Sequence, residues 1–153
     1  MHQLCRAVWP RWLDTAVLSG ALDAQTDKLA GAPVALVTVH SFTPIYHGEP
    51  RRVELGLLHD ADPTLARAML TEAAGTLTLN AQLNAPYDAS DGVTHTLKRH
   101  AIPRGLPNVM LELRNDLLAM PAGVARTAHG LARPLARGLD RVGIGLAGRA
   151  DAR

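Results

Sequence analysis

The sequence is poor in aromatic residues and cysteine, and it has no long hydrophobic run. Aromatic residues make up only 3% of the 153 residues, so the core must be built from Leu, Val and Ala, and specific nucleic-acid binding is disfavoured. The single cysteine, Cys5, excludes a disulfide framework and suits a reducing compartment. The longest apolar runs are far below a membrane span, and the N-terminus lacks a signal-peptide pattern. We therefore expect a cytoplasmic protein.

What the sequence does contain is ordinary globular composition. Hydrophobic residues form 47% of the chain and charged residues 20%, with a formal net charge of +2. A chain of this length can bury a sizeable core. The composition therefore predicts a single domain over residues 1–153, with residues 121–153 forming a basic tail that is helical and broken by prolines.

Helical and strand-like patterns alternate along the chain. The periodicities predict these elements in order: helix 10–28, strand 34–39, strand 53–58, a helix capped by Asp62 with Pro63 at its first position, strand 77–81, a helical turn at 93–100, and strand 108–114. Polar residues follow the short strands, which is where α/β proteins place their chemistry. The pattern therefore predicts an α/β fold with a mostly parallel or mixed sheet.

Two of the predicted strands carry polar residues of interest. The buried run VALVTV delivers His40 at its carboxyl end. In the strand 108–114, side chains alternate between faces, so Met110, Glu112 and Arg114 share one face. The purely structural interpretation is that His40 is a hydrogen-bonded structural residue and that Glu112 and Arg114 form an ion pair at a sheet edge.

Several separate motifs resemble one family, in the order in which that family has them. The segments are VTVHSFTPIYHG, GLLHDAD, NAPYD and GVTHTLKRHAIPRGLPNVMLELRNDLL. Together they resemble the N-formylglutamate amidohydrolases from about Val34 to Leu118. The resemblance implies a three-layer α/β/α domain of the zinc carboxypeptidase and aspartoacylase-like kind. It also implies hydrolysis of N-formyl-L-glutamate to formate and glutamate, a step of histidine degradation.

The resemblance implies roles for individual residues that their chemistry allows. His40 matches a zinc ligand, and a neutral imidazole at a strand end is a good divalent-metal ligand. Glu112 matches a catalytic glutamate, which would take a proton from water and pass it to the leaving nitrogen.

A substrate of this kind is a small anionic N-acyl amino acid, and a cationic pocket would favour it. We expect Arg114 to hold a substrate carboxylate or to steady Glu112, with Arg99 as the second choice for the carboxylate. Neighbouring His100 and Arg104 complete that cationic cluster.

The chain departs from the family pattern at its beginning. A catalytic zinc normally has three protein ligands, and family members carry two of them, with a substrate-binding asparagine and arginine, in a segment before the first helix seen here. Met1 stands where that segment should already have ended, so we expect an incomplete ligand set and an exposed sheet edge prone to self-association. The alternative to an enzyme is a catalytically inactive remnant that binds small anions or a partner.

Overall fold

A computed structural model of the chain describes residues 19–24 and 33–145. The chain divides into two compact units, Met1–Ala32 and Pro33–Arg153. In the first unit, residues 19–24 are helical, and most of the predicted helix 10–28 lies outside the described residues.

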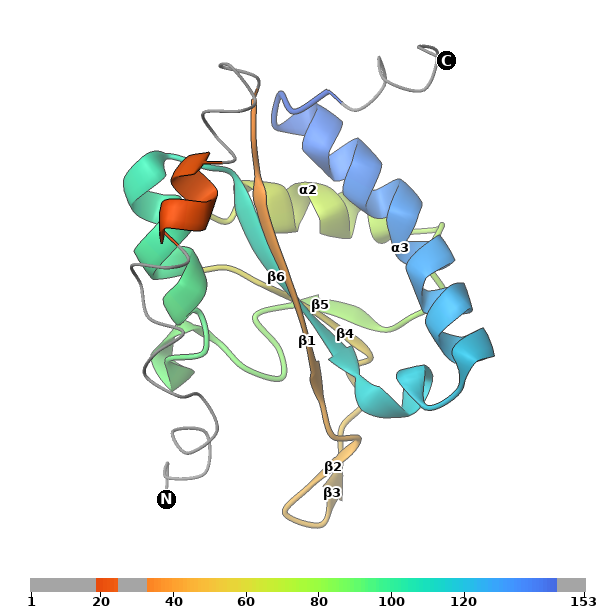
Figure 1. The fold of residues 1–153 in the computed structure, drawn as a ribbon. Helices are drawn as coiled ribbons and strands as arrows, with labels where there is room; N and C mark the ends of the chain where they lie inside the picture. Colours follow the sequence, from red (N-terminus) through yellow and green to blue (C-terminus); the bar gives the residue numbers. More distant parts are fainter. Residues whose placement is uncertain (1–18, 25–32, 146–153) are drawn as a thin grey trace. The chain divides into compact units, whose positions relative to one another are not determined.

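The second unit alternates strands and helices (Figure 1). Its strands are β1 (Leu36–Phe42), β2 (Ile45–Tyr46), β3 (Glu49–Pro50), β4 (Leu55–Leu58), β5 (Ala81–Leu83) and β6 (Asn108–Arg114). Its long helices are α2 (Thr64–Ala73) and α3 (Pro121–Arg141). Short turns complete it, namely 3-10 turns at Ala89–Asp91, Ile102–Arg104 and Asn115–Leu118 and a π-helical turn at Leu97–Ala101. Among the described residues, no helix is both long enough and apolar enough to cross a membrane.

Four strands form one mixed sheet in the order β1-β6-β4-β5. β1 runs parallel to β6, β4 runs antiparallel to β6, and β5 runs parallel to β4. β6 is therefore an interior strand, and in the described part of the chain β1 lies at an edge of this sheet. Val39 on β1 is 64% exposed, in line with the expected apolar sheet edge, and self-association through that edge stays a prediction. β2 and β3 form a separate two-stranded hairpin.

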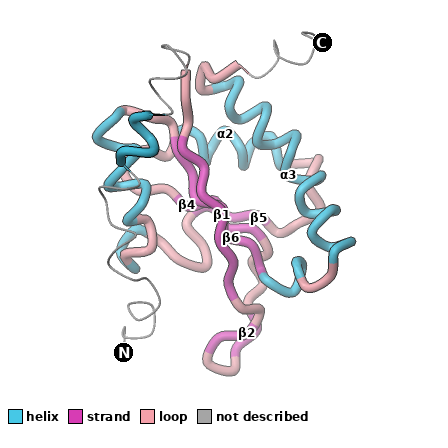
Figure 2. Tube along the Cα trace, viewed as in Figure 1, coloured by secondary structure: helices cyan, strands magenta, loops and turns pink. Residues whose placement is uncertain are grey.

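Alternation along the strands gives the sheet two different faces, as Figure 2 shows with helical segments on both sides of the strands. Val109, Leu111 and Leu113 join the larger core cluster, which includes Leu65 and Met69 of α2. We call this side the helix face, because α2 and α3 cover it. Even-numbered residues of β1 and β6 point to the other side, which we call the site face. The layers therefore form the α/β/α arrangement that the family resemblance implies.

The site face is covered by the chain between β5 and β6. Leu58 of β4 and Met110 of β6 pack there against Leu97 of the π-helical turn. Partly buried Tyr87 and Val93 extend the cluster. This second, smaller core ends at Met110, and the next site-face residue of β6 is Glu112. Two buried polar side chains, Asn108 and Glu112, thus flank Met110 on this face of β6.

Several predicted boundaries shift in the structure. Strand 108–114 is confirmed to the residue, and α2 buries Leu65, Met69 and Ala73 as expected. α2 begins at Thr64, and its N-cap residue is Pro63 and not Asp62 as predicted. The Asp62 carboxylate, one residue before the cap, accepts hydrogen bonds from the backbone nitrogen and the hydroxyl of Thr64, at 3.0 and 2.6 Å.

Two predictions of secondary structure are wrong. The strand expected at 77–81 is found at Ala81–Leu83. Leu77 and Leu79 pack against the core from an irregular segment, so their alternation reflects burial without strand pairing. The broken helix expected from residue 121 is one continuous helix, α3, although Pro134 lies inside it. Pro134 is fully buried, and packing against α2 offsets the hydrogen bond that a proline removes.

Candidate functional site

Three residues form a row across neighbouring strands on the site face. His40 of β1 is in register with Glu112 of β6, and Glu112 is in register with Gly56 of β4. Side chains of registered residues emerge on the same face of a sheet. The structure therefore brings together the predicted metal ligand and the predicted catalytic carboxylate, which lie 72 residues apart in the sequence (112 − 40).

Glycine at position 56 makes room beside the carboxylate. A Cβ atom there would lie 2.2 Å from the carbonyl oxygen of Ala85 and 3.1 Å from the Cβ of Glu112. Glycine inside a strand often marks a close backbone approach. Here it lets the Ala85 carbonyl lie directly over the sheet. The loop after β5, which contains Ala85, is attached to the end of β4, because the side-chain oxygen of Asn84 accepts a hydrogen bond from the His59 backbone nitrogen at 2.9 Å.

Glu112 is a buried carboxyl group with an unsatisfied oxygen. The residue is 5% exposed, and its Oε2 atom accepts no hydrogen bond from the described residues. Burial raises the pKa of Glu112 from 4.5 to about 7, and the positive charge of Arg51 opposes this rise. A carboxyl group with a pKa near neutrality can both take up and release a proton at physiological pH, as a general base must.

His40 is half-buried at the edge strand, and burial lowers its pKa. The neutral imidazole is the form that binds metals. However, no group of three histidine, cysteine or acidic residues able to hold a metal ion occurs within residues 19–24 and 33–145. A zinc site with three protein ligands is therefore not complete in this part of the chain, and His40 as a zinc ligand stays a prediction.

Arg114 is already engaged by carboxylates of the protein. Its Nε atom donates to Asp116 at 2.8 Å and its Nη2 atom donates to Glu54 at 3.1 Å. Its Nη1 atom donates to the backbone carbonyl of Arg51 at 3.1 Å. The expected alternative, an edge ion pair between Arg114 and Glu112, is not what the structure contains, because the partners of Arg114 are Asp116 and Glu54. Binding of substrate by Arg114 stays a prediction.

The second predicted cationic group lies on the turns that precede β6. Arg99 is exposed, whereas His100 is 3% exposed. Burial lowers the pKa of His100, and the nearby charges of Arg104 and Arg99 lower it further. Arg104 donates to the His100 carbonyl at 3.1 Å. These three residues therefore form one local cluster, and their contact with substrate stays a prediction.

Sequence reasoning missed Arg51, which lies just after β3. Its guanidinium carbon is 4.4 Å from the ring centre of Tyr46, 4.9 Å from that of Tyr87 and 5.5 Å from that of Phe42. Its Nη1 atom donates to the Tyr87 hydroxyl at 3.0 Å. We call this group of three rings around Arg51 the aromatic cage. A signal was present, because every aromatic residue beyond Trp12 belongs to the cage, and all three lie in the family motifs.

Local structure explains how the cage closes. β2 and β3 are joined by a two-residue turn in which His47 and Gly48 have φ angles of 50° and 83°, as a tight hairpin requires. The hairpin returns the chain so that the Arg51 backbone nitrogen donates to the Pro44 carbonyl at 2.8 Å. The hairpin thereby brings Tyr46 and Phe42 close to Arg51, and Tyr87 comes from the loop after β5. Arg51 is the residue whose charge acts on Glu112.

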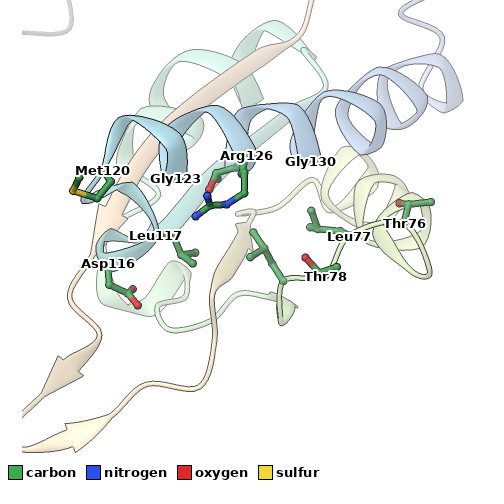
Figure 3. A pocket seen from close by; sticks show the side chains of 11 residues that line it. Thr76, Leu77, Thr78, Asp116, Leu117, Met120, Gly123, Arg126 and Gly130 are labelled. Atoms are coloured by element: carbon green, nitrogen blue, oxygen red, sulfur yellow. The ribbon is translucent and has the colours of Figure 1, made fainter.

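A cavity of about 300 Å³ lies elsewhere in the molecule. Figure 3 shows its lining side chains between the start of α3 and residues 76–79. Asp116, Met120 and Arg126 line it, and neither His40 nor Glu112 does. The row on the site face is a better candidate, because the cavity contains no buried side-chain atom without a hydrogen-bond partner, whereas the row does.

Comparison with known proteins agrees with the motifs. The family model described as N-formylglutamate amidohydrolase matches residues 16–119. The crystal structure of gene product Atu2144 from Agrobacterium tumefaciens is similar, with 45% sequence identity and a TM-score of 0.78. That match covers 84% of this chain and 50% of that chain, so the present chain spans half the length of this relative. No curated protein matches the chain.

The matched region contains β1 to β6 and therefore the whole row of His40, Glu112 and Gly56. It also contains Arg51 and its aromatic cage. Since the family model covers more than half of the 153 residues, the chain belongs to the N-formylglutamate amidohydrolase family.

Proposed function

We propose that the protein hydrolyses the amide bond of an N-acyl amino acid, with N-formyl-L-glutamate as the substrate that its family suggests. The observation that carries the proposal is Glu112, a buried carboxyl group with one unsatisfied oxygen and a pKa of about 7. It lies beside His40 on the site face, next to the apolar cluster of Leu58, Leu97 and Met110.

In the proposed reaction, ionised Glu112 removes a proton from a water molecule as the water oxygen attacks the acyl carbon. The carbon–nitrogen bond then breaks, and protonated Glu112 returns the proton to the leaving nitrogen. The products are a carboxylic acid and a free amino acid. The low exposure of Glu112 keeps bulk water from stabilising its charge, so the proton can be gained and lost near neutral pH.

A zinc ion would assist the proposed reaction, in which Glu112 moves the protons. A bound zinc ion would polarise the acyl oxygen and acidify water. His40 is the described residue that we propose as a ligand, because burial lowers the pKa of its imidazole, which favours the neutral form, and because it lies next to Glu112. Further ligands would have to come from outside the described residues or from a second chain.

The experiment that tests the reaction is formate release from N-formyl-L-glutamate by the purified protein and by Glu112→Gln. The amide has the same shape as the carboxyl group but cannot act as a base. We expect the turnover of Glu112→Gln to fall about 100- to 10,000-fold, with unchanged folding by circular dichroism. Equal turnover in the two proteins would remove Glu112 from the mechanism. Substrate binding without any turnover would favour the binding-module alternative.

A separate measurement tests His40. We expect elemental analysis to find about one zinc per chain in the wild-type protein and in His129→Ala, and little in His40→Ala. His129 is the matched control because it is an exposed histidine of α3. Zinc that stays bound to His40→Ala would show that another residue is the ligand.

A further inference from the structure

Arg51 differs from Arg114 and Arg141 in having no carboxylate partner among the described residues. Arg114 pairs with Glu54 and Asp116, and Arg141 pairs with Glu72. Within the described residues, Arg51 forms no such pair, and of its guanidinium nitrogens only Nη1 donates hydrogen bonds, to the Tyr87 hydroxyl and more weakly to the Thr43 carbonyl at 3.5 Å. A guanidinium group has five N–H donors. Nε and Nη2 of Arg51 therefore keep donors available on one edge.

The guanidinium group is nevertheless held in place. Three aromatic rings lie within 5.5 Å of its central carbon, and the electrostatic attraction of a cation to a ring face favours this geometry. Arg114 adds a hydrogen bond to the Arg51 backbone carbonyl. An arginine that is packed among aromatic rings and whose Nε and Nη2 atoms have no partner among the described residues is preorganised for a carboxylate, which it can bind with two parallel hydrogen bonds.

The position of Arg51 connects this donor edge with the reaction site. Its positive charge acts on the Glu112 carboxyl group. Phe42 of the cage is the last residue of β1, two positions after His40. A carboxylate bound at Arg51 would therefore lie close to the row of His40, Glu112 and Gly56. The carboxylate of an N-acyl amino acid lies only a few bonds from its scissile amide. Such a substrate could therefore contact Arg51 with its carboxylate while its amide lies at the row.

We propose that Arg51, held in the aromatic cage, binds a carboxylate group of the substrate and so determines the preference for acidic N-acyl amino acids. This inference rests on the proposed function for the identity of the substrate, but not for the existence of an anion site. It gives Arg51 the role that sequence reasoning gave to Arg114. The competing explanation is purely structural, in which the cation only ties the hairpin to the loop after β5.

The test uses two pairs of ligands that differ in a carboxylate. Glutarate and its uncharged diamide, glutaramide, probe the anion site alone. N-formyl-L-glutamate and N-formyl-L-glutamine probe it in the substrate. Binding is measured by calorimetry and by NMR of the arginine Nε–H groups, with the full 153-residue chain. The variants are Arg51→Met, Arg51→Lys and Arg52→Met. Arg52 is the matched control, because it is the adjacent arginine, is exposed and lies outside the cage.

We expect glutarate to shift the Arg51 Nε–H resonance and glutaramide to leave it unchanged. Arg51→Met should weaken glutarate binding about 10- to 100-fold, as loss of a charge-assisted hydrogen-bond pair predicts. Arg51→Lys should retain part of the affinity, since it keeps the charge and loses the planar fork. Arg52→Met should bind like the wild type. If Arg51→Met does not fold, the wild-type resonance and Arg51→Lys decide the question.

Failure of this inference is distinguishable from failure of the proposed function. Formate release with no difference in carboxylate preference between Arg51→Met and Arg52→Met would overturn the role of Arg51 and leave the hydrolase standing. Arg51-dependent glutarate binding without formate release would support the anion site and overturn the hydrolase. A wild-type protein that binds neither glutarate nor N-formyl-L-glutamate would overturn both.

Discussion

The helix face and the site face belong to the same four-stranded sheet, yet they are filled in different ways. On the helix face, Val109, Leu111 and Leu113 meet α2 and α3 in one continuous apolar cluster. On the site face, apolar packing stops at Met110. In the described residues, three buried side-chain atoms lack a hydrogen-bond partner, namely Thr38 Oγ1, Asn108 Oδ1 and Glu112 Oε2. All three are at even-numbered positions of β1 and β6, on the site face.

Within the single strand β6, the residues on the helix face therefore stabilise the fold, and we propose that Glu112 on the site face serves the reaction. A buried polar atom without a partner costs free energy of folding, so its persistence usually marks a strain reservoir or a functional site. The helix face supplies the compensating stability, because apolar burial is the dominant favourable contribution to folding. Neighbouring residues of β6 should therefore respond to mutation in opposite ways, and Leu111 and Glu112 are the clearest pair.

Replacing Leu111 with alanine should produce the largest loss of stability. Leu111 is 3% exposed in the main cluster, so Leu111→Ala should lower the free energy of unfolding by about 2–5 kcal/mol. Activity per folded molecule should remain close to that of the wild type, in contrast to Glu112→Gln. Urea unfolding and formate release measure the two effects. Val124→Ala, at an exposed site on α3, is the control, and a similar loss there would contradict this account of the helix face.

The second prediction concerns pH. Glu112 has a pKa of about 7 in the folded protein and an ordinary pKa of 4.5, so between these values the folded protein holds a proton that the unfolded chain releases. Raising the pH therefore favours unfolding. The wild type should lose about 3 kcal/mol of stability relative to Glu112→Gln between pH 4.5 and 7, and no more above pH 8. A constant difference between the two proteins in urea unfolding would show that Glu112 titrates normally.

Much of this arrangement could be predicted from the sequence, because it depends on local patterns. The run Asn108–Arg114 predicts the bounds of β6, and the alternation of side chains along any strand predicts the division of its residues between the two faces. Strand 34–39 was found two residues later, as Leu36–Phe42. That shift left His40 and Glu112 on adjacent strands, as expected. Their catalytic and metal-binding roles remain predictions, since position alone does not establish chemistry.

Tertiary contacts could not be predicted in the same way. The position of Arg114 on β6 predicts that it binds an anion, but Glu54, 60 residues away in the sequence, pairs with it. Periodicity does not point to Arg51, because its contact with Tyr87 spans 36 residues. Leu77 and Leu79 alternate like a strand but contact the core from a loop. In each case, a contact between distant segments decides the structure, and periodicity carries no information about such contacts.

The last prediction, with the smallest effect, concerns the cage itself. Tyr87→Phe removes the hydroxyl that accepts from Arg51 Nη1 at 3.0 Å and keeps the ring. The free energy of unfolding should fall by only about 0.5–1.5 kcal/mol, the usual net value of one hydrogen bond. Tyr46→Phe is the matched control, because the Tyr46 ring also faces Arg51.

If Arg51 binds the substrate carboxylate, Tyr87→Phe should change the free energy of glutarate binding more than the free energy of unfolding. The guanidinium group loses its fixed orientation, while the hydrophobic contacts of the ring remain. Calorimetry with glutarate and urea unfolding measure the two quantities on the same protein samples. A large loss of stability with unchanged glutarate affinity would show that the aromatic cage stabilises the fold, as the helix face does, and does not bind carboxylates.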